Sequence, residues 1–289
     1  MSQITAAMVK ELRERTGQGM MDCKKALEEA GGDIEKAIDD MRAAGAIRAA
    51  KKAGNIAAEG SVAIKLSEDG KSATIIEVNS QTDFLALQED FKNFVAESLD
   101  IAVAKGYTDA APLIEECEGA REQLVSKTGE NVNIRRLARV EGEVLGSYQH
   151  GNRIAAVVCL EGGDEELARD IAMHVAASNP QVVNPEDVAE DVIAKEKEIF
   201  IQRNEDKIKG KPENIVENMI KGSLNKFLSE VSLVGQAFVK DPDVTVGKLA
   251  EKAGAKIIGF TRYEVGEGIE RAEEDFAAEV AAQVAASRK

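Results

Sequence analysis

The spacing between apolar residues changes along this chain from that of a strand to that of a helix and back, and it does so twice. This repeat restricts what the chain can fold into. After Glu59-Gly60 the apolar residues alternate with polar ones, as in strands, then recur at helical spacing, and then alternate again. The same order begins at Glu141-Gly142, 82 positions later. We therefore expect an α+β fold with two related core subdomains, each a three-stranded antiparallel sheet with helices on one face.

Each subdomain is expected to contain a hairpin, then helices, then a final strand. The turn Glu68-Asp69-Gly70 joins the first two strands of one subdomain, and His150-Gly151-Asn152 joins those of the other. The strands are expected at residues 62–66, 73–78, 134–140, 144–148, 154–160 and 256–265, and the helices at residues 91–102, 113–124, 167–175 and 246–253.

Two further helical regions accompany the second subdomain. Residues 186–232 show helical spacing on both sides of Gly210-Lys211-Pro212, which predicts an inserted antiparallel helical hairpin, a short coiled coil. This hairpin either projects and docks on a partner or a second copy of the chain, or it folds down on the core. Residues 270–286 predict an acidic C-terminal helix, which docks either on its own core or on a partner.

The first fifty residues predict a bundle of three short helices. Thr5 and Asp33 are the expected N-caps of the first and third helices. In the second helix, Met21 and Leu27 are expected to face inward. Residues 45–58 are basic and rich in alanine, and they indicate a helical or flexible linker. The domain limits that follow are 1–54 for the bundle, 55–140 and 141–265 for the core subdomains, 186–232 for the inserted hairpin and 266–289 for the C-terminal helix.

The charge of the chain argues against several kinds of partner. Its 289 residues carry a net charge of −15, which disfavours binding to nucleic acid or anionic lipid through phosphate neutralisation. Residues 1–55 hold ten Lys and Arg against nine Asp and Glu, whereas the remaining residues hold 27 against 43. The N-terminal bundle is therefore electrostatically distinct from the body, which suggests a separate contact surface.

The cysteines and the apolar runs indicate the compartment. Cys23, Cys117 and Cys159 are odd in number and far apart, so we expect no disulfide framework and no structural zinc site. The longest apolar run, Ile154 to Leu160, is far shorter than the roughly 20 residues needed to span a bilayer. With no signal peptide expected at the N-terminus, the sequence predicts a cytoplasmic protein.

The sequence contains none of the common catalytic motifs. His150 and His174 are the only histidines, and no nucleophile elbow, zinc-protease motif or phosphate-binding loop occurs. We therefore expect a protein that is not an enzyme and needs no cofactor and no metal. An acidic hydrolase with paired carboxylates is the enzymatic alternative, and it would need two carboxylates that meet in a pocket.

One short segment is open to two interpretations. In Gln81-Thr82-Asp83-Phe84-Leu85 a polar turn leads into two large apolar residues where a helix begins. In the first interpretation Thr82 or Asp83 caps the helix and Phe84 packs into the core. In the second, the segment presents a carboxylate and an apolar wedge side by side to a partner.

Long stretches of the sequence resemble the bacterial elongation factor Ts family. The stretches are RTGQGMMDCKKAL (15–27), GDIEKAI (32–38), GAIRAAKKAGNIAAEG (45–60), EVNSQTDF (77–84), NIRRLARVEG (133–142), LGSYQHG (145–151), EVSLVGQAFV (230–239) and EVGEGIE (264–270). The resemblance implies a ubiquitin-associated-like bundle, two related core subdomains, an inserted helical hairpin and a C-terminal helix. It also implies a guanine-nucleotide exchange factor for the GTPase elongation factor Tu.

The resemblance implies roles for particular residues. The family's Thr-Asp-Phe-Val motif, which enters the partner's nucleotide domain and displaces Mg²⁺, corresponds here to Thr82, Asp83, Phe84 and Leu85, with one aliphatic residue exchanged for another. The expected further partner contacts are Arg13, Met20, Met21, Lys24 and His150. A pure adaptor that holds a ubiquitin-like protein on its bundle is the competing hypothesis, and it gives the wedge no purpose.

Overall fold

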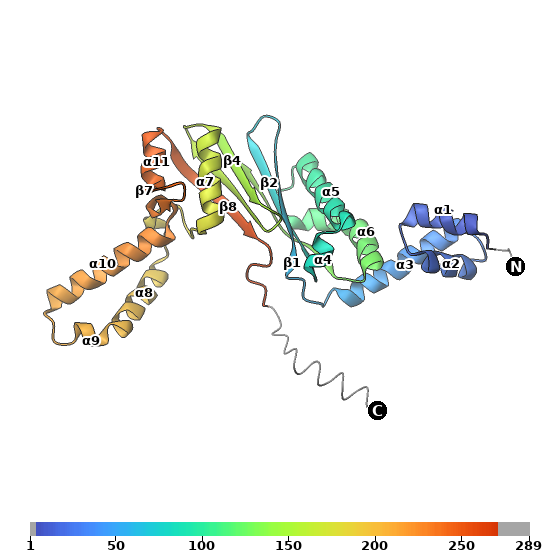
Figure 1. Ribbon diagram of the computed structural model, residues 1–289, viewed down its shortest axis with the longest axis horizontal. Coiled ribbons are helices and arrows are strands. Elements are labelled where there is room, and N and C mark those ends of the chain that lie inside the picture. The colour runs from blue at the N-terminus through green and yellow to red at the C-terminus, as the bar shows by residue number, and fades with distance from the viewer. Residues whose placement is uncertain (1–3, 271–289) are drawn as a thin grey trace, which may run out of the picture.

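The computed structural model describes residues 4–270 and contains a bundle, two central sheets and a projecting arm in a row (Figure 1). The N-terminal bundle lies at one end, the sheets occupy the middle, and a helical hairpin lies at the other end. Apart from Glu270, the expected C-terminal helix lies outside the described residues. The α+β fold class expected from the periods is confirmed.

The two sheets have the predicted number of strands and the predicted antiparallel pairing. The first contains β1 (Glu59–Leu66), β2 (Ser72–Ser80) and β3 (Val132–Glu141) in the order β1-β2-β3. The second contains β4 (Val144–His150), β5 (Ile154–Glu161) and β8 (Lys256–Glu264) in the order β4-β5-β8. All four pairings are antiparallel, so two three-stranded antiparallel sheets are confirmed.

Helices cover the outer face of each sheet. The short α4 (Asp83–Ala86), α5 (Glu89–Lys105) and α6 (Ala110–Thr128) pack on the first sheet, where Phe91, Leu113 and Ile76 share one core. α7 (Glu165–Ser178) and α11 (Val246–Lys252) pack on the second, where Ile171 and Val158 belong to a separate core. These helices confirm the expected cover on one face.

The inner faces of the two sheets pack against each other. The spacing of apolar residues in the sequence did not indicate this contact. Val62 and Ile75 of the first sheet share a buried cluster with Ala155 and Val265. A second cluster joins Ala73 to residues of β4 and β5. Every residue of β2 is buried, because α5 covers one of its faces and the second sheet covers the other.

The glycines of the repeated Glu-Gly pairs stand where backbone or sulfur approaches closely. A Cβ at Gly60 would lie 2.1 Å from the Val78 carbonyl oxygen, and its φ of +137° also disfavours other residues. A Cβ at Gly142 would lie 2.2 Å from the Cys159 sulfur. The repeated Glu-Gly pair in the sequence therefore lies at or just before the start of the first strand of each sheet, where a Cβ would clash.

The N-terminal bundle contains α1 (Ala6–Thr16), α2 (Met20–Glu29) and α3 (Ile34–Lys52). Thr5 and Asp33 cap α1 and α3 as predicted. Helix α3 is 19 residues long, so it includes most of the expected linker, and it packs on α6. The prediction that Met21 faces inward is wrong. Its side chain is 75% exposed, because Cys23, Ala26 and Leu27 form the inward face of α2.

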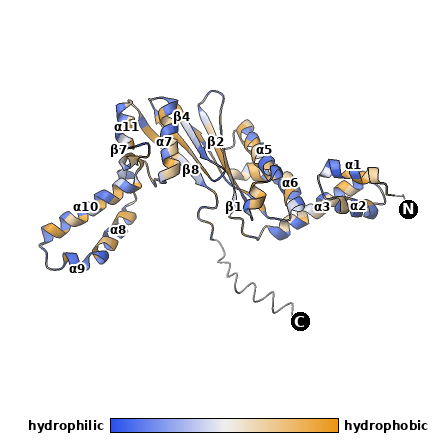
Figure 2. Ribbon diagram, viewed as in Figure 1, coloured by the Kyte–Doolittle hydropathy of each residue, from blue (hydrophilic) through white to orange (hydrophobic). Residues whose placement is uncertain are grey.

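The inserted helices project from the body instead of folding onto it (Figure 1). They are α8 (Glu190–Arg203), the short α9 (Glu205–Ile208) and α10 (Glu213–Val231), and neither α8 nor α10 has a buried residue. Figure 2 shows apolar and polar residues interspersed along both arms. A small hairpin of β6 (Ala237–Phe238) and β7 (Asp241–Thr245) follows the arm and was not expected.

Within residues 4–270, no helix is long and apolar enough to cross a membrane.

The buried His174 holds the chain that leaves the projecting arm. Its Nδ1 accepts a hydrogen bond from the Val239 amide at 3.1 Å, so its proton resides on Nε2, which donates to the Gln236 side-chain oxygen at 2.9 Å. Burial lowers the pKa of His174, and the hydrogen bond to Gln236 only partly opposes this effect. A second proton would have to displace the Val239 amide.

We predict that acid destabilises the protein through His174. Unfolded histidine binds a proton near pH 6.5 whereas buried His174 does not, so the free energy of unfolding should fall below that pH. The slope should be at most about 1.4 kcal/mol per pH unit. Urea unfolding between pH 5 and 8 measures it. His174→Asn should lose this contribution, and the control His150→Asn should keep it; equal slopes for the wild type and His174→Asn would contradict the assignment.

Candidate functional site

The segment Thr82–Leu85, which we call the finger, begins two residues after the end of β2 and contains the N-cap and the first three residues of the one-turn helix α4. The Thr82 hydroxyl oxygen accepts a hydrogen bond from the Leu85 amide at 3.2 Å and so caps the helix. Asp83 lies in the first helical turn, where a negative charge interacts favourably with the helix dipole. The sequence therefore places a rigid turn at the end of the most buried strand.

The finger divides its two large apolar side chains between the core and solvent. Leu85 is 1% exposed and belongs to the same core as Phe91. Phe84 is 76% exposed, and Asp83 is exposed beside it. The first interpretation of this segment is right that Thr82 caps the helix and wrong that Phe84 packs into the core, and the second is right that a carboxylate and an aromatic ring are exposed side by side. Leu85, the fourth residue of the finger, lies instead in the core and is not on the surface.

Polar contacts fix the first residue of the finger. The Thr82 amide and hydroxyl both donate to the Glu130 carboxylate, at 3.0 and 2.9 Å. The Ser80 hydroxyl donates to the Thr82 carbonyl oxygen at 2.9 Å. The backbone of the finger is thus held on both sides of Thr82, while Phe84 remains free of the core.

Four predicted contact residues of the bundle line one groove. This groove, of about 390 Å³, lies between α1 and α2, and its lining combines apolar side chains with three basic ones. Its lining residues are Ile4, Thr5, Ala6, Val9, Lys10, Arg13, Met20, Met21 and Lys24. The exposure of Met20 and Met21, at 60% and 75%, leaves two adaptable apolar side chains at the surface.

The charges around the groove favour an acidic occupant. Among residues 4–270, Lys10 and Lys24 each form a long ion pair, of 3.7 and 3.8 Å, with an exposed glutamate one turn along the same helix. Exposed pairs of this kind are worth little and are easily exchanged for another carboxylate. The groove is therefore suited to an amphipathic surface with apolar side chains and acidic neighbours.

His150 lies at the end of β4, at the same end of the sheets as the finger. Its ring stacks on Tyr148 with centroids 6.3 Å apart. The following turn contacts the start of β1, where the Asn152 carbonyl oxygen accepts from the Val62 amide and Arg153 pairs with Glu59 at 2.7 Å. Glu59 is the partner of Ser80, the residue two positions before the finger. Sheet packing thus brings together two elements that the sequence separates widely.

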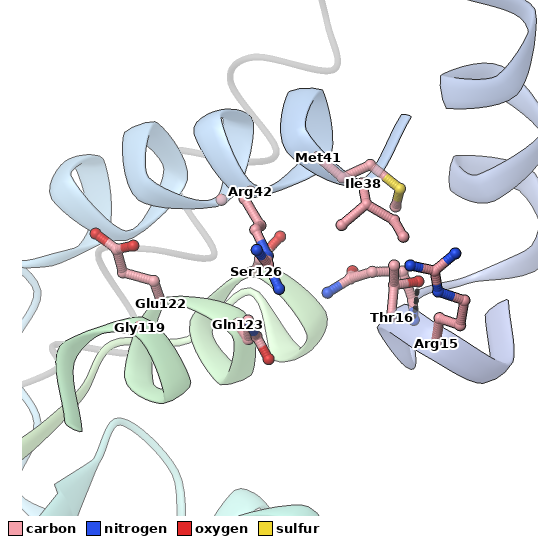
Figure 3. Close-up of a pocket in the computed structure, with 11 residues that line it drawn as sticks. Arg15, Thr16, Ile38, Met41, Arg42, Gly119, Glu122, Gln123 and Ser126 are labelled. Atoms are coloured by element: carbon pink, nitrogen blue, oxygen red, sulfur yellow. Dashed lines mark hydrogen bonds between the residues drawn. The ribbon is translucent and has the colours of Figure 1, made fainter. Parts of the chain in front are cut away.

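A second crevice, of about 280 Å³, separates the bundle from the body (Figure 3). Side chains of α1, α3 and α6 converge on it, among them Arg15, Arg42 and Gln123. A Cβ at Gly45 of α3 would lie 3.5 Å from the Cβ of Ser126 of α6, so α3 and α6 are in close contact beside this crevice. Nothing in the periodicity of the sequence indicated this contact, which sets the direction in which the bundle leaves the body.

The other chemically reactive groups do not form a centre. Cys23, Cys117 and Cys159 are buried, and burial raises the pKa values of the Cys117 and Cys159 thiols. Across residues 4–270, no group of three or more His, Cys, Asp or Glu side chains is placed to hold a metal ion. The finger and the groove are accordingly the candidate functional surfaces.

We predict opposite effects on stability for the two adjacent apolar residues of the finger. Leu85→Ala should lower the free energy of unfolding by about 2–5 kcal/mol, since it leaves a cavity in the core. Phe84→Ala should change it by less than about 0.5 kcal/mol, because the ring is largely exposed. Urea unfolding at neutral pH measures both values, and a large loss in Phe84→Ala would show that the ring is packed.

Comparison with known proteins gives a consistent family. The family model described as "Elongation factor TS" matches residues 81–267. Proteins named elongation factor Ts from Azotobacter vinelandii, Pseudomonas aeruginosa strain LESB58 and Stutzerimonas stutzeri are each 72% identical over 289 residues, which is the full length of both chains. The family model includes the whole finger, β3 and the second sheet, and the relatives align over the full chain. The chain therefore belongs to the elongation factor Ts family of translation elongation factors.

Proposed function

We propose that this protein binds elongation factor Tu in its GDP-bound form and promotes GDP release, so that GTP can replace it. The finger would enter the partner's nucleotide domain, where Asp83 and Phe84 would displace the bound Mg²⁺ and loosen the diphosphate site. The observation that carries the proposal is the exposure of Phe84, 76%, on a turn whose neighbour Leu85 is anchored in the core.

The chemistry required is displacement without a covalent step. In GTPases the Mg²⁺ ion contacts phosphate and protein oxygens and holds the switch loops in place. An aromatic side chain that moves an adjoining helix, with a carboxylate beside it, would disturb that coordination. Asp83 would supply the carboxylate and Phe84 the aromatic ring. Both side chains are exposed and not packed in the protein's own core, so a partner can reach them.

The energy of one aromatic ring limits what the finger alone can do. Burying one phenylalanine side chain contributes about 1.5–3 kcal/mol, which corresponds to roughly a 10- to 200-fold change in affinity. Binding is also reciprocal: if the factor weakens GDP binding, the nucleotide weakens binding of the factor by the same ratio. A second contact is therefore needed to hold the partner while its nucleotide leaves.

The groove on the bundle is suited to be that second contact. Arg13, Met20, Met21 and Lys24 lie together on it and provide apolar area with positive charge. His150, at the finger's end of the sheets, would add a contact from the second subdomain. A pure adaptor would need only the groove, so the structured finger favours the exchange factor over that alternative.

We predict that Phe84→Ala slows factor-stimulated GDP release by at least about tenfold, because the wedge loses most of its apolar area. Release of a fluorescent GDP analogue from elongation factor Tu, followed after mixing with excess GTP, measures the rate. Ile114→Ala, which shortens an exposed apolar side chain on α6, is the matched control and should keep the wild-type rate. Wild-type kinetics in Asp83→Ala/Phe84→Ala would reject the wedge.

For the groove we predict an effect on affinity instead of maximal rate. Met20→Ala/Met21→Ala should raise the factor concentration at half-maximal exchange by about tenfold, since the lining of the groove loses apolar area. The rate at saturation should stay within about twofold of the wild type. Titration of the factor in the same assay separates the two quantities, with Lys25→Ala on the same helix as control. An unchanged half-maximal concentration would remove the groove from the interface.

A further inference from the structure

Three segments that are far apart in the sequence meet at the base of the finger. They are the end of α3 near Asn55, the residues Gln81 and Thr82 after β2, and the turn between α6 and β3 at Glu130 and Asn131. Hydrogen bonds join them in two groups, one between Glu130 and Thr82 and one among Asn131, Gln81 and Asn55, and the two groups are adjacent along the chain. Of these residues, Asn55, Glu130 and Asn131 lie outside the segment 81–85 that the sequence singled out.

Glu130 determines how the Thr82 hydroxyl is used. That hydroxyl has one proton, and the Glu130 carboxylate accepts it at 2.9 Å. The oxygen lone pairs then remain available to accept the Leu85 amide, which is the capping bond of α4. The same carboxylate accepts from the Thr82 amide at 3.0 Å. One side chain therefore fixes both the backbone and the rotamer of the capping residue.

Asn131 links this arrangement to the bundle. Its backbone amide donates to the Gln81 side-chain oxygen at 2.7 Å, and its side-chain amide donates to the Asn55 backbone carbonyl oxygen at 2.8 Å. The Asn55 side chain in turn donates to the same Gln81 oxygen at 3.1 Å. Asn131 is 4% exposed, so water competes little for these bonds. The end of α3 and the base of the finger are thus tied to one turn.

A helix as short as α4 has little stability of its own. It contains four residues, and an isolated turn does not compensate for the cost of fixing its dihedral angles. The buried Leu85 provides one anchor at its end, and the Glu130–Thr82 contacts provide the other at its start. Without the second anchor, Phe84 would sample several orientations, and each binding event would bear the cost of ordering it.

We infer that Glu130 is a positioning residue for nucleotide exchange: acting through Thr82, it holds Phe84 in the orientation in which the ring enters the partner. This inference rests on the proposed function. Asn131 supports the same geometry by joining the finger to the end of α3, whose other end belongs to the bundle that bears the groove. The two contact surfaces therefore keep a fixed spacing.

The first test separates maximal rate from affinity. Glu130→Ala should lower the saturating rate of GDP release from elongation factor Tu by at least about fivefold and change the half-maximal factor concentration by less than about twofold. Glu130→Asp keeps the charge but draws the carboxylate away from Thr82, so it should be slow as well. Glu130→Gln retains an oxygen acceptor for the Thr82 amide and should keep at least about half of the wild-type rate. Glu115→Ala, on the exposed face of α6, is the control.

The second test asks whether Glu130 acts through the ring. In the Phe84→Ala background, Glu130→Ala should slow release by less than about 1.5-fold further, because the ring that it positions is gone. Thermal melts of each variant confirm that the rates are compared on folded protein.

The outcomes distinguish this inference from the proposed function. Equal slowing by Glu130→Ala in both backgrounds, or a wild-type saturating rate in both Glu130→Ala and Glu130→Asp, would overturn the inference while the wedge stands. A wild-type rate in Phe84→Ala would reject the wedge and the inference with it, and no stimulation of GDP release by the unaltered protein would overturn the proposed function.

Discussion

The opposite placement of two adjacent side chains, Leu85 and Phe84, is the constraint on which the site depends. One residue is sealed in the first core while its neighbour stands in solvent. This is stable because Thr82 begins a helical turn at that point and Glu130 holds Thr82. The buried Leu85 and the Glu130–Thr82 contacts therefore anchor the turn on both sides of the exposed aromatic ring.

The rest of the fold supplies a fixed frame for this turn. The inner faces of the sheets meet around β2, and buried Glu77 in this layer accepts hydrogen bonds from Arg135, Arg136 and the Gly266 amide. Burial alone would raise the pKa of Glu77, but the bonds from Gly266, Asn79 and Arg136 outweigh it and hold the pKa below its usual value. The carboxylate stays charged and joins the last described turn to the first sheet.

The spacing of apolar residues predicted the helices and strands well but predicted poorly how they pack against one another. An alternating pattern shows which face of a strand is apolar, so β1 to β5 and β8 could be placed. It does not show what covers that face, and the contact between the sheets was missed. Periodicity also assigned Met21 to the interior, although the small bundle core is already filled by residues such as Cys23 and Leu27. The proposed role of the groove residues came from the family resemblance, and the proposed wedge came from the residues and the resemblance together. The positions of Glu130 and Asn131 became visible only when distant segments met in the fold.

The most direct measurement of the central claim replaces Phe84 with a photoreactive phenylalanine analogue and irradiates its complex with GDP-loaded elongation factor Tu. Peptide mapping then locates the cross-link. The account predicts one dominant cross-link in the partner's nucleotide domain, close to the residues that hold Mg²⁺, and suppression of it by excess GDP. Cross-links confined to other domains of the partner, in a complex that still exchanges nucleotide, would contradict it.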